Sequence, residues 1–233
     1  MAKRVLLKIS GEVLGGADGN GIDAKALKFL CEEIKTLVKK KFQVAIVVGG
    51  GNFWRFRDNA DLKIPRSSSD AIGMMATIMN ARLLKETLEG MGQKAHALAP
   101  HSTFYFAEPY VPARGSELLD RGEVVICGGG TGNPYFTTDS AAALRALELG
   151  CDLLLKATKV EGVFDRDPMK DKKAKFFKKI SYDEVLKREL KIMDLTSIVL
   201  CKENKLPVTV FKLMQKGNML KAAQGKSHGT LIN

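Results

Sequence analysis

Short apolar runs alternate with segments of helical periodicity along this chain, and this alternation limits the possible folds more than any other feature. We expect strands near residues 5–9, 44–48, 95–98, 124–127, 153–155, 208–211 and 230–232. We expect helices from about residue 23, at 72–88, in the stretch DSAAALRALELG from residue 139, and near 182–189 and 195–203. Strands that alternate with helices are typical of βαβ units. The 233-residue sequence therefore predicts an α/β fold with a largely parallel sheet.

The opening residues and the cysteines indicate the cellular compartment of the protein. The opening stretch MAKRVLLKIS has too short an apolar run for a signal peptide or a membrane anchor. Four cysteines lie far apart in apolar segments, as buried reduced thiols do; they are Cys31, Cys127, Cys151 and Cys201. We therefore expect a cytoplasmic protein with no membrane partner. In the Met-rich helix we expect Met74, Met75 and Met79 to belong to the core.

The net charge of +11 indicates an anionic partner. Nucleic acid is one candidate, because clustered lysines attract phosphate without reading sequence. The densest cluster is KDKKAKFFKKI at residues 170–180, and its aromatic residues are Phe176 and Phe177. We interpret this segment as a solvated loop beside an edge strand, so nucleic acid is not the partner that we expect.

Three glycine-rich stretches follow directly on three of the expected strands. They are KISG at residues 8–11, GGGN at 49–52 and GGGTGN at 128–133. The carboxyl ends of parallel strands share one edge of the sheet, and the helices that follow begin there. Such loops present backbone N–H groups and a helix dipole to phosphate oxygens. The sequence therefore predicts a phosphate-binding site at this edge.

Standard nucleotide-binding and hydrolase motifs do not fit the chain. Gly225, Lys226 and Ser227 look like the end of a P-loop, but Leu220 occupies the position of its first glycine. The same stretch, GKSHG, fits a GxSxG elbow only in its letters, since residues 230–233 leave no room for a later histidine. We expect a turn into the last strand there. Three histidines without HExxH spacing argue against a protein-built metal site.

Two cations at the glycine-rich edge suit phosphoryl transfer, in which a protein mainly positions the reactants and stabilises negative charge. Lys8 ends the first strand beside Ser10 and Gly11, so its ammonium group is placed to follow a transferred phosphate. Arg55 follows GGGNFW and has the planar fork that binds phosphate oxygens. Either residue alone would be read as a surface cation, and their common edge favours a catalytic role.

Several motifs together resemble the bacterial uridylate kinase family, within the amino acid kinase superfamily. They are KISGE, GGGNFWR, DAIGMMATIMN, GTGNPYFTTDSAA, KATKVEGVFDRDP, KIMDL and GTLI, and they span essentially the whole chain. The resemblance implies a three-layer αβα sandwich with a central, mostly parallel sheet. It implies ATP-dependent phosphorylation of UMP to UDP, with Mg²⁺ bound to the nucleotide. One domain over residues 1–233 would bind the acceptor with roughly 1–150 and ATP with roughly 151–233.

The resemblance also implies roles for individual residues. ATP would be bound by Lys8, Ile9, Ser10, Gly11, Gly51, Arg55, Thr158, Phe164 and Asp167. UMP would be bound by Gly50, Asp70, Thr131, Gly132, Asn133, Pro134, Tyr135, Phe136, Thr137 and Thr138, with Asp70 at the ribose and Thr131 and Asn133 near the uracil. The implied catalytic residues are Lys8, Arg55, Asp139 and Asp194, the two aspartates as organisers of Lys8 and of magnesium. Without the resemblance, either aspartate would be read as a helix cap.

Departures from the family pattern concern assembly and control. Phe56 stands where the family usually has glycine, and Ala71 where it more often has histidine. The family implies a homo-hexamer with GTP and UTP as possible effectors, and the long apolar stripe at residues 72–88 supports assembly.

Two other functions stay open from the sequence. One is another small-acceptor kinase of the superfamily, such as a carbamate or glutamate kinase, although GTGNPYFTTD argues against it. The other is a non-catalytic module that senses nucleotides or binds nucleic acid. Such a module would explain the positive charge, but it would not require Lys8, Asp139 and Asp194 together.

Overall fold

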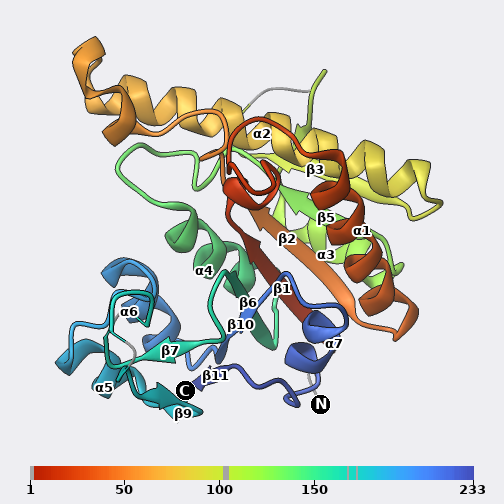
Figure 1. The fold of residues 1–233 in the computed structure, drawn as a ribbon. Coiled ribbons are helices and arrows are strands. Elements are labelled where there is room, and N and C mark those ends of the chain that lie inside the picture. Colours follow the sequence, from red (N-terminus) through yellow and green to blue (C-terminus); the bar gives the residue numbers. More distant parts are fainter. Residues whose placement is uncertain (1–2, 102–104, 167, 172) are drawn as a thin grey trace.

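The computed structural model describes residues 3–101, 105–166, 168–171 and 173–233, and a nine-stranded sheet runs through this part of the chain (Figure 1). Its strands are β1 (Arg4–Ile9), β2 (Gln43–Val48), β3 (Ala95–Ala99), β4 (Glu108–Pro109), β5 (Val124–Cys127), β6 (Leu153–Thr158), β9 (Lys179–Ile180), β10 (Val208–Lys212) and β11 (Thr230–Ile232). Their order is β4-β3-β5-β2-β1-β6-β10-β11-β9. Neighbouring strands are parallel except β10 and β11, so the predicted sheet is confirmed.

Helices cover both faces of the sheet and make three layers (Figure 1). One face packs against α1 (Ala24–Lys39), α2 (Arg66–Gly90) and α7 (Asn218–Ala223). The other packs against α3 (Pro112–Asp120), α4 (Thr138–Glu148), α5 (Tyr182–Lys187) and α6 (Leu195–Glu203). Two 3-10 helices, Gly11–Val13 and Phe56–Leu62, and an antiparallel pair formed by β7 (Val163–Phe164) and β8 (Phe176–Phe177) complete the description. The αβα sandwich is the expected fold.

The central elements form where the sequence pattern predicts them. Every residue of β2 is buried, as expected for a strand of a parallel sheet that is covered on both faces. The α1 helix begins after Asp23, whose carboxylate accepts a hydrogen bond from the N–H of Ala26 at 2.8 Å, the predicted N-cap. The four cysteines are buried and free. None of the helices among the described residues combines the length and the apolar character needed to cross a bilayer.

Some elements differ from the sequence prediction. Helix α2 begins at Arg66, six residues before the expected start, because the polar stretch 66–71 has no apolar periodicity to reveal a helix. Helix α3, which starts with Pro112 at its first turn, and the six-residue α7 were not predicted, since neither is long enough for a clear periodic pattern. The basic segment 170–180 contains β8 and β9, so it is only partly the loop that we expected.

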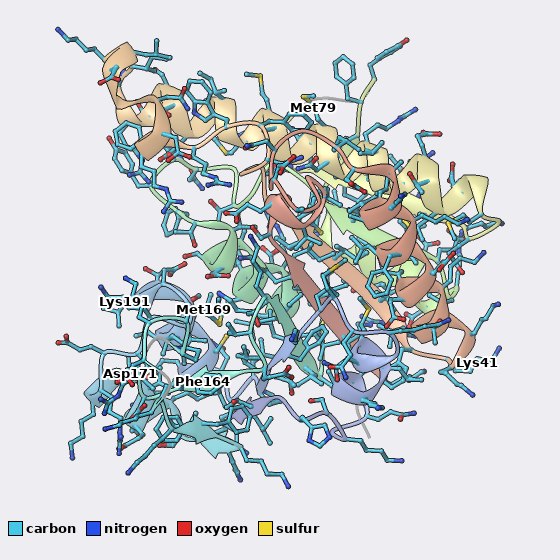
Figure 2. The ribbon with its side chains drawn as sticks, in the orientation of Figure 1. Lys41, Met79, Phe164, Met169, Asp171 and Lys191 are labelled. Atoms are coloured by element: carbon cyan, nitrogen blue, oxygen red, sulfur yellow. The ribbon has the colours of Figure 1, made fainter. Side chains whose placement is uncertain are left out.

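The expectation that all three methionines of α2 belong to the core is wrong. The buried face of α2 presents Ala81 and Leu84 to the sheet, whereas Met79, labelled in Figure 2, is exposed. Met75 and Met79 lie four residues apart on a different face and are 59% and 57% exposed. Met74 lines the cavity described below. The apolar stripe of α2 therefore extends past the surface that the sheet covers.

Candidate functional site

The carboxyl ends of β1, β2 and β5 meet at one edge of the sheet, and the three glycine-rich stretches contribute to one cavity of about 530 Å³ there. We call it the acceptor cavity, after the role that is proposed for it below. The predicted site residues that line it are Lys8, Ser10, Gly11, Gly50, Gly51, Arg55, Asp70, Thr131, Asn133, Phe136, Thr137 and Thr138. The structure therefore brings residues from four separate parts of the chain to the predicted edge.

Two lysines meet one aspartate beside this cavity. Lys8 on β1 and Lys156 on β6 are register partners on neighbouring parallel strands, so their side chains leave the same face of the sheet. Lys8 Nζ lies 2.7 Å from Asp139 Oδ1, and Lys156 Nζ donates to Asp139 Oδ2 at 2.6 Å. The exposed fraction of the side chain is only 12% for Lys8, 10% for Lys156 and 14% for Asp139. One carboxylate from α4 thus holds two cations at the ends of adjacent strands.

Burial and charge shift the protonation of this cluster. Burial disfavours the charged form of Asp139, but the charges of Lys8 and Lys156 outweigh it and hold the pKa of the carboxyl below its ordinary value. Burial, together with the charge of Lys8, lowers the pKa of Lys156 to about 8, although Asp139 opposes this. Asp139 is therefore ionised at neutral pH, and Lys156 gives up its proton far more readily than an exposed lysine.

The two predicted catalytic aspartates have different places in the structure. Thr137 caps α4, and its hydroxyl accepts hydrogen bonds from the N–H groups of Asp139 and Ser140 at 3.0 and 3.4 Å. The helix-cap interpretation of Asp139 is therefore wrong, because Thr137 supplies the cap and the Asp139 carboxylate pairs with the lysines. Asp194 is the N-cap of α6, accepting from the N–H of Ser197 at 2.8 Å. For Asp194 the cap interpretation is confirmed.

Asp194 also joins the start of α6 to the start of α4. Its carboxylate accepts from the Ser140 hydroxyl at 2.9 Å, from the Ser140 N–H at 3.1 Å and from the Thr137 hydroxyl. A carboxylate with this many donors has little capacity left to act as an inner ligand of a metal ion. Within the described ranges no three His, Cys, Asp or Glu side chains form a group that could hold a metal ion. The described side chains therefore do not form a magnesium site of their own.

Arg55 lies in the wall of the acceptor cavity and is already oriented by protein groups. Its Nε donates to the Gly51 carbonyl at 2.8 Å, and its guanidinium pairs with Glu12 at 3.1 Å and with Asp58 at 3.5 Å. Glu12 also pairs with Lys159 at 3.4 Å. These contacts preorganise Arg55 next to the first two glycine-rich stretches. The Arg55 side chain is 26% exposed and lines the cavity, so it stays accessible to an anion.

Asp70 shapes another part of the cavity wall. Its two carboxylate oxygens share the single N–H of Arg66 Nε, at 2.8 and 2.9 Å, and one of them also accepts from the N–H of Tyr135 at 2.8 Å. Tyr135 has a φ of +70°, a left-handed conformation that is costly for a non-glycine residue. Asp70 thus fixes the stretch that follows β5 and still lines the cavity.

The second glycine-rich stretch requires glycine at position 50 for its packing against α2. A Cβ atom at Gly50 would lie 2.8 Å from both the Ala76 Cβ and the Gly73 carbonyl oxygen of α2. The loop can therefore rest on α2 only if this residue is glycine. Two asparagines also tie this loop to α2. The side chains of Asn52 and Asn80 exchange hydrogen bonds at 2.7 and 3.2 Å, and Asn80 Nδ2 donates to the Gly49 carbonyl at 2.8 Å.

Other predicted residues lie outside the lining of the acceptor cavity. Thr158 and Phe164 line a second cavity of about 550 Å³, which also includes Arg166 and Lys170. The side chain of Ile9 is fully buried in the core. The remaining predicted residues that do not line the acceptor cavity are Gly132, Pro134, Tyr135, Asp139 and Asp194. Asp167 lies outside the described residues.

Sequence reasoning missed several residues of the site, and three of them make contacts with predicted residues or with the loops around them. Lys156, Glu12 and Thr77 were not among the predicted residues, although Glu12 and Thr77 line the acceptor cavity and Lys156 pairs with Asp139. For Lys156 a signal existed, because a lysine within the apolar run LLLKAT must be paired if the strand is buried. For Glu12 and Thr77 the contacts come from other segments of the chain and leave no local pattern.

A model of the amino acid kinase family matches residues 3–212. The chain belongs to this family. It is 47% identical over 226 residues to a uridylate kinase of Aliarcobacter butzleri, covering 97% of this chain and 96% of that protein. It is 43% identical over 230 residues to a uridylate kinase of Methylococcus capsulatus, covering 99% and 96%. The solved structure of a UMP kinase from Bacillus anthracis matches with a TM-score of 0.97 and 36% identity, covering 100% of this chain and 96% of that one.

Proposed function

We propose that this chain transfers the γ-phosphoryl group of ATP to UMP and releases UDP and ADP. The cluster of Lys8, Asp139 and Lys156 carries the proposal, because it holds two ammonium groups beside a cavity lined by glycine-rich loops. Phosphoryl transfer requires positive charge at such a place and little covalent chemistry from the protein. Relatives named uridylate kinase at 43% and 47% identity support UMP as the acceptor.

In the proposed reaction, a phosphate oxygen of UMP attacks the γ-phosphorus of ATP while the bond from that phosphorus to the ADP oxygen breaks. The Lys8 ammonium would stay with the transferring group, and Asp139 would keep Lys8 in position. Gly51 and Arg55 lie in the cavity wall nearby and would bind phosphate oxygens before and during transfer. Because the donors are held by protein contacts before substrates arrive, little reorganisation accompanies the reaction.

The two nucleosides would occupy separate cavities. Asp70 would accept hydrogen bonds from the ribose hydroxyls of UMP, with Thr131 and Asn133 near the uracil in the acceptor cavity. Thr158 and Phe164 would hold the ATP nucleoside in the second cavity. This arrangement supports an acceptor-binding part at roughly 1–150 and an ATP-binding part at roughly 151–233. Mg²⁺ is proposed only as a companion of the nucleotide phosphates, where it would neutralise part of their charge.

A coupled assay of ADP release against UMP, CMP, AMP and GMP tests this proposal. UMP is expected to be strongly preferred, because a purine would overfill the acceptor cavity and leave polar groups of Thr131 and Asn133 unpaired. Carbamate and glutamate in the same panel test the other kinases of the superfamily. Equal turnover of AMP would refute the uridylate assignment, and nucleotide binding without any turnover would favour a non-catalytic module.

Assembly and control are further parts of the proposal. The exposed Met75 and Met79 lie four residues apart on one face of α2, and a contiguous exposed apolar face of this kind supports assembly. The resemblance to the family suggests that the assembly is a homo-hexamer. GTP and UTP are proposed as effectors, to be tested by adding each to the UMP assay. Light scattering at working concentration tests the hexamer independently of the chemistry, and a monomer would exclude it.

A further inference from the structure

The loop that follows β5 has unusual conformational freedom. Gly129, Gly130 and Gly132 have φ values of +74°, +58° and +88°, a region open to glycine and strained for other residues. Glycines alone do not select one arrangement of such a loop, because they adopt many others as easily. A hydrogen bond from the Gly132 N–H to the Gly129 carbonyl at 3.0 Å closes a turn in this loop, and side chains that reach it from neighbouring elements fix how the turn lies in the wall of the acceptor cavity.

Two helices on opposite faces of the sheet supply such side chains. Thr77 of α2 accepts a hydrogen bond from the Gly129 N–H at 2.7 Å. Arg145 of α4 donates from Nη2 to the Gly130 carbonyl at 3.1 Å. The loop is thus held between the two helical layers. Thr77 lines the acceptor cavity, whereas Arg145 is buried and lies outside its lining.

Arg145 is itself fixed by a compact polar cluster. Its Nη1 donates to Glu148 at 2.7 Å, and its guanidinium carbon lies 4.0 Å from the centre of the Tyr110 ring. The Tyr110 hydroxyl donates to the same Glu148 carboxylate at 2.8 Å. The Arg145 side chain is only 5% exposed, and its Nε has no hydrogen-bond partner among the described residues. A cation buried with an unsatisfied N–H is costly, and stability alone does not explain why it is there.

The peptide between Gly130 and Thr131 explains what this cation does. The C=O and N–H of a trans peptide point in opposite directions. Because Arg145 holds the Gly130 carbonyl, the Thr131 N–H points away from the guanidinium. We propose that Arg145 is a positioning residue that keeps this peptide from flipping, so that the Thr131 N–H faces the acceptor nucleotide and donates to one of its oxygens. The identity of the acceptor as UMP rests on the proposed function.

Two measurements on Arg145→Met test this role. Hydrogen exchange of the ligand-free protein is expected to be faster across residues 129–133 in the variant, because the loop loses its tether. The KM for UMP is expected to rise about tenfold, while the KM for ATP stays within about twofold, because only the acceptor wall is released. A purely structural role would lower the thermal midpoint without separating the two KM values.

Two further variants keep the test decisive. Tyr110→Phe retains the ring under the guanidinium and both Arg145 hydrogen bonds, so its exchange and KM values should match the parent. If Arg145→Met alone is unstable, Arg145→Met with Glu148→Gln removes both charges and leaves no buried ion unpaired. Parental exchange and parental KM for UMP in a folded Arg145 variant would overturn the proposal. A parent that does not turn over UMP would refute the proposed function, while ligand-free exchange would still report on Arg145.

Discussion

Replacing Asp139 by asparagine removes a charge while keeping the shape of the side chain. The carboxylate lies 2.7 Å from Lys8 Nζ and 2.6 Å from Lys156 Nζ. At an effective dielectric constant of about 20, two unit charges this close attract by about 6 kcal/mol. Desolvation offsets part of this attraction. Removing one partner of a buried pair lowers the free energy of unfolding by about 3–5 kcal/mol, because it leaves a buried charge without compensation. We expect the thermal midpoint of Asp139→Asn to fall by about 6–20 °C.

The kinetic effect of the same substitution follows from where Lys8 acts. In the proposed reaction, the interaction of Lys8 with the transferring phosphoryl group strengthens as charge moves in the transition state. Without the Asp139 carboxylate, Lys8 is not kept in position, and this stabilisation of the transition state is lost. We expect kcat to fall about 100-fold or more, with little change in the KM values of ATP and UMP. The assay is ADP release at saturating ATP and UMP, at a temperature where circular dichroism shows the variant to be folded.

A cap variant elsewhere separates lost stability from lost catalysis. Asp23→Ala removes the N-cap of α1, which costs about 1 kcal/mol, and should leave kcat unchanged on the folded protein. If Asp139→Asn lowers stability as calculated but keeps the parental kcat, then the carboxylate serves only the fold. The catalytic reasoning would then be refuted, and Lys8 would have to act without an organiser.

Three other perturbations have defined outcomes. Since the pKa of Lys156 is about 8, kcat/KM for ATP should fall about tenfold per pH unit above pH 8 if ATP binds productively only when Lys156 is charged. Lys156→Arg stays charged throughout this range and should abolish the fall. The unfolded chain holds this proton up to about pH 10.5, so the free energy of unfolding of the parent should rise relative to Lys156→Met between pH 8 and 10.5 in urea titrations. Arg55→Ala should raise the KM of a nucleotide about tenfold with little change in kcat, as steady-state assays would show. Replacing Met75 and Met79 by serine should weaken the proposed assembly in light scattering, while circular dichroism should show that the chain keeps its fold, because both side chains are exposed on the single chain.

The fold could be predicted from the sequence because several of its strands carry two separate signals. Runs such as 44–48 and 124–127 are apolar throughout, as strands covered on both faces must be, and a glycine-rich stretch ends each one. The start of α2 could not be predicted, because residues 66–71 become helical through their continuation into the packed part of the helix. Met75 and Met79 were misplaced for a related reason: helical spacing shows which residues share a face, and it does not show how wide the covered face is.

The candidate site was predicted in its residues more fully than in its contacts. The stretch TTD at 137–139 offers three possible caps, and only the structure assigns the cap to Thr137 and the lysine contacts to Asp139. The pairing of Arg55 with Glu12 depends on two loops that are separated by 42 residues and brought together by the sheet. Contacts of this kind have no local pattern, because they arise from the order of the strands.

The order of the strands also explains why the charged cluster stands where it does. The chain passes from β1 to β2 on one side and later to β6 on the other, so β1 lies where the strand order reverses, the usual position of a ligand site in an open α/β sheet. Lys8 and Lys156 are direct cross-strand neighbours there, and like charges so placed are destabilising. Asp139 pairs with both ammonium groups, and the charge of Asp194 also favours the charged form of Lys156. Burial is the main cause of the lowered pKa of Lys156, and the charge of Lys8 adds to it. The fold therefore keeps two nearly buried cations where the strand order reverses, and the phosphates of the proposed nucleotide would bring further negative charge to them.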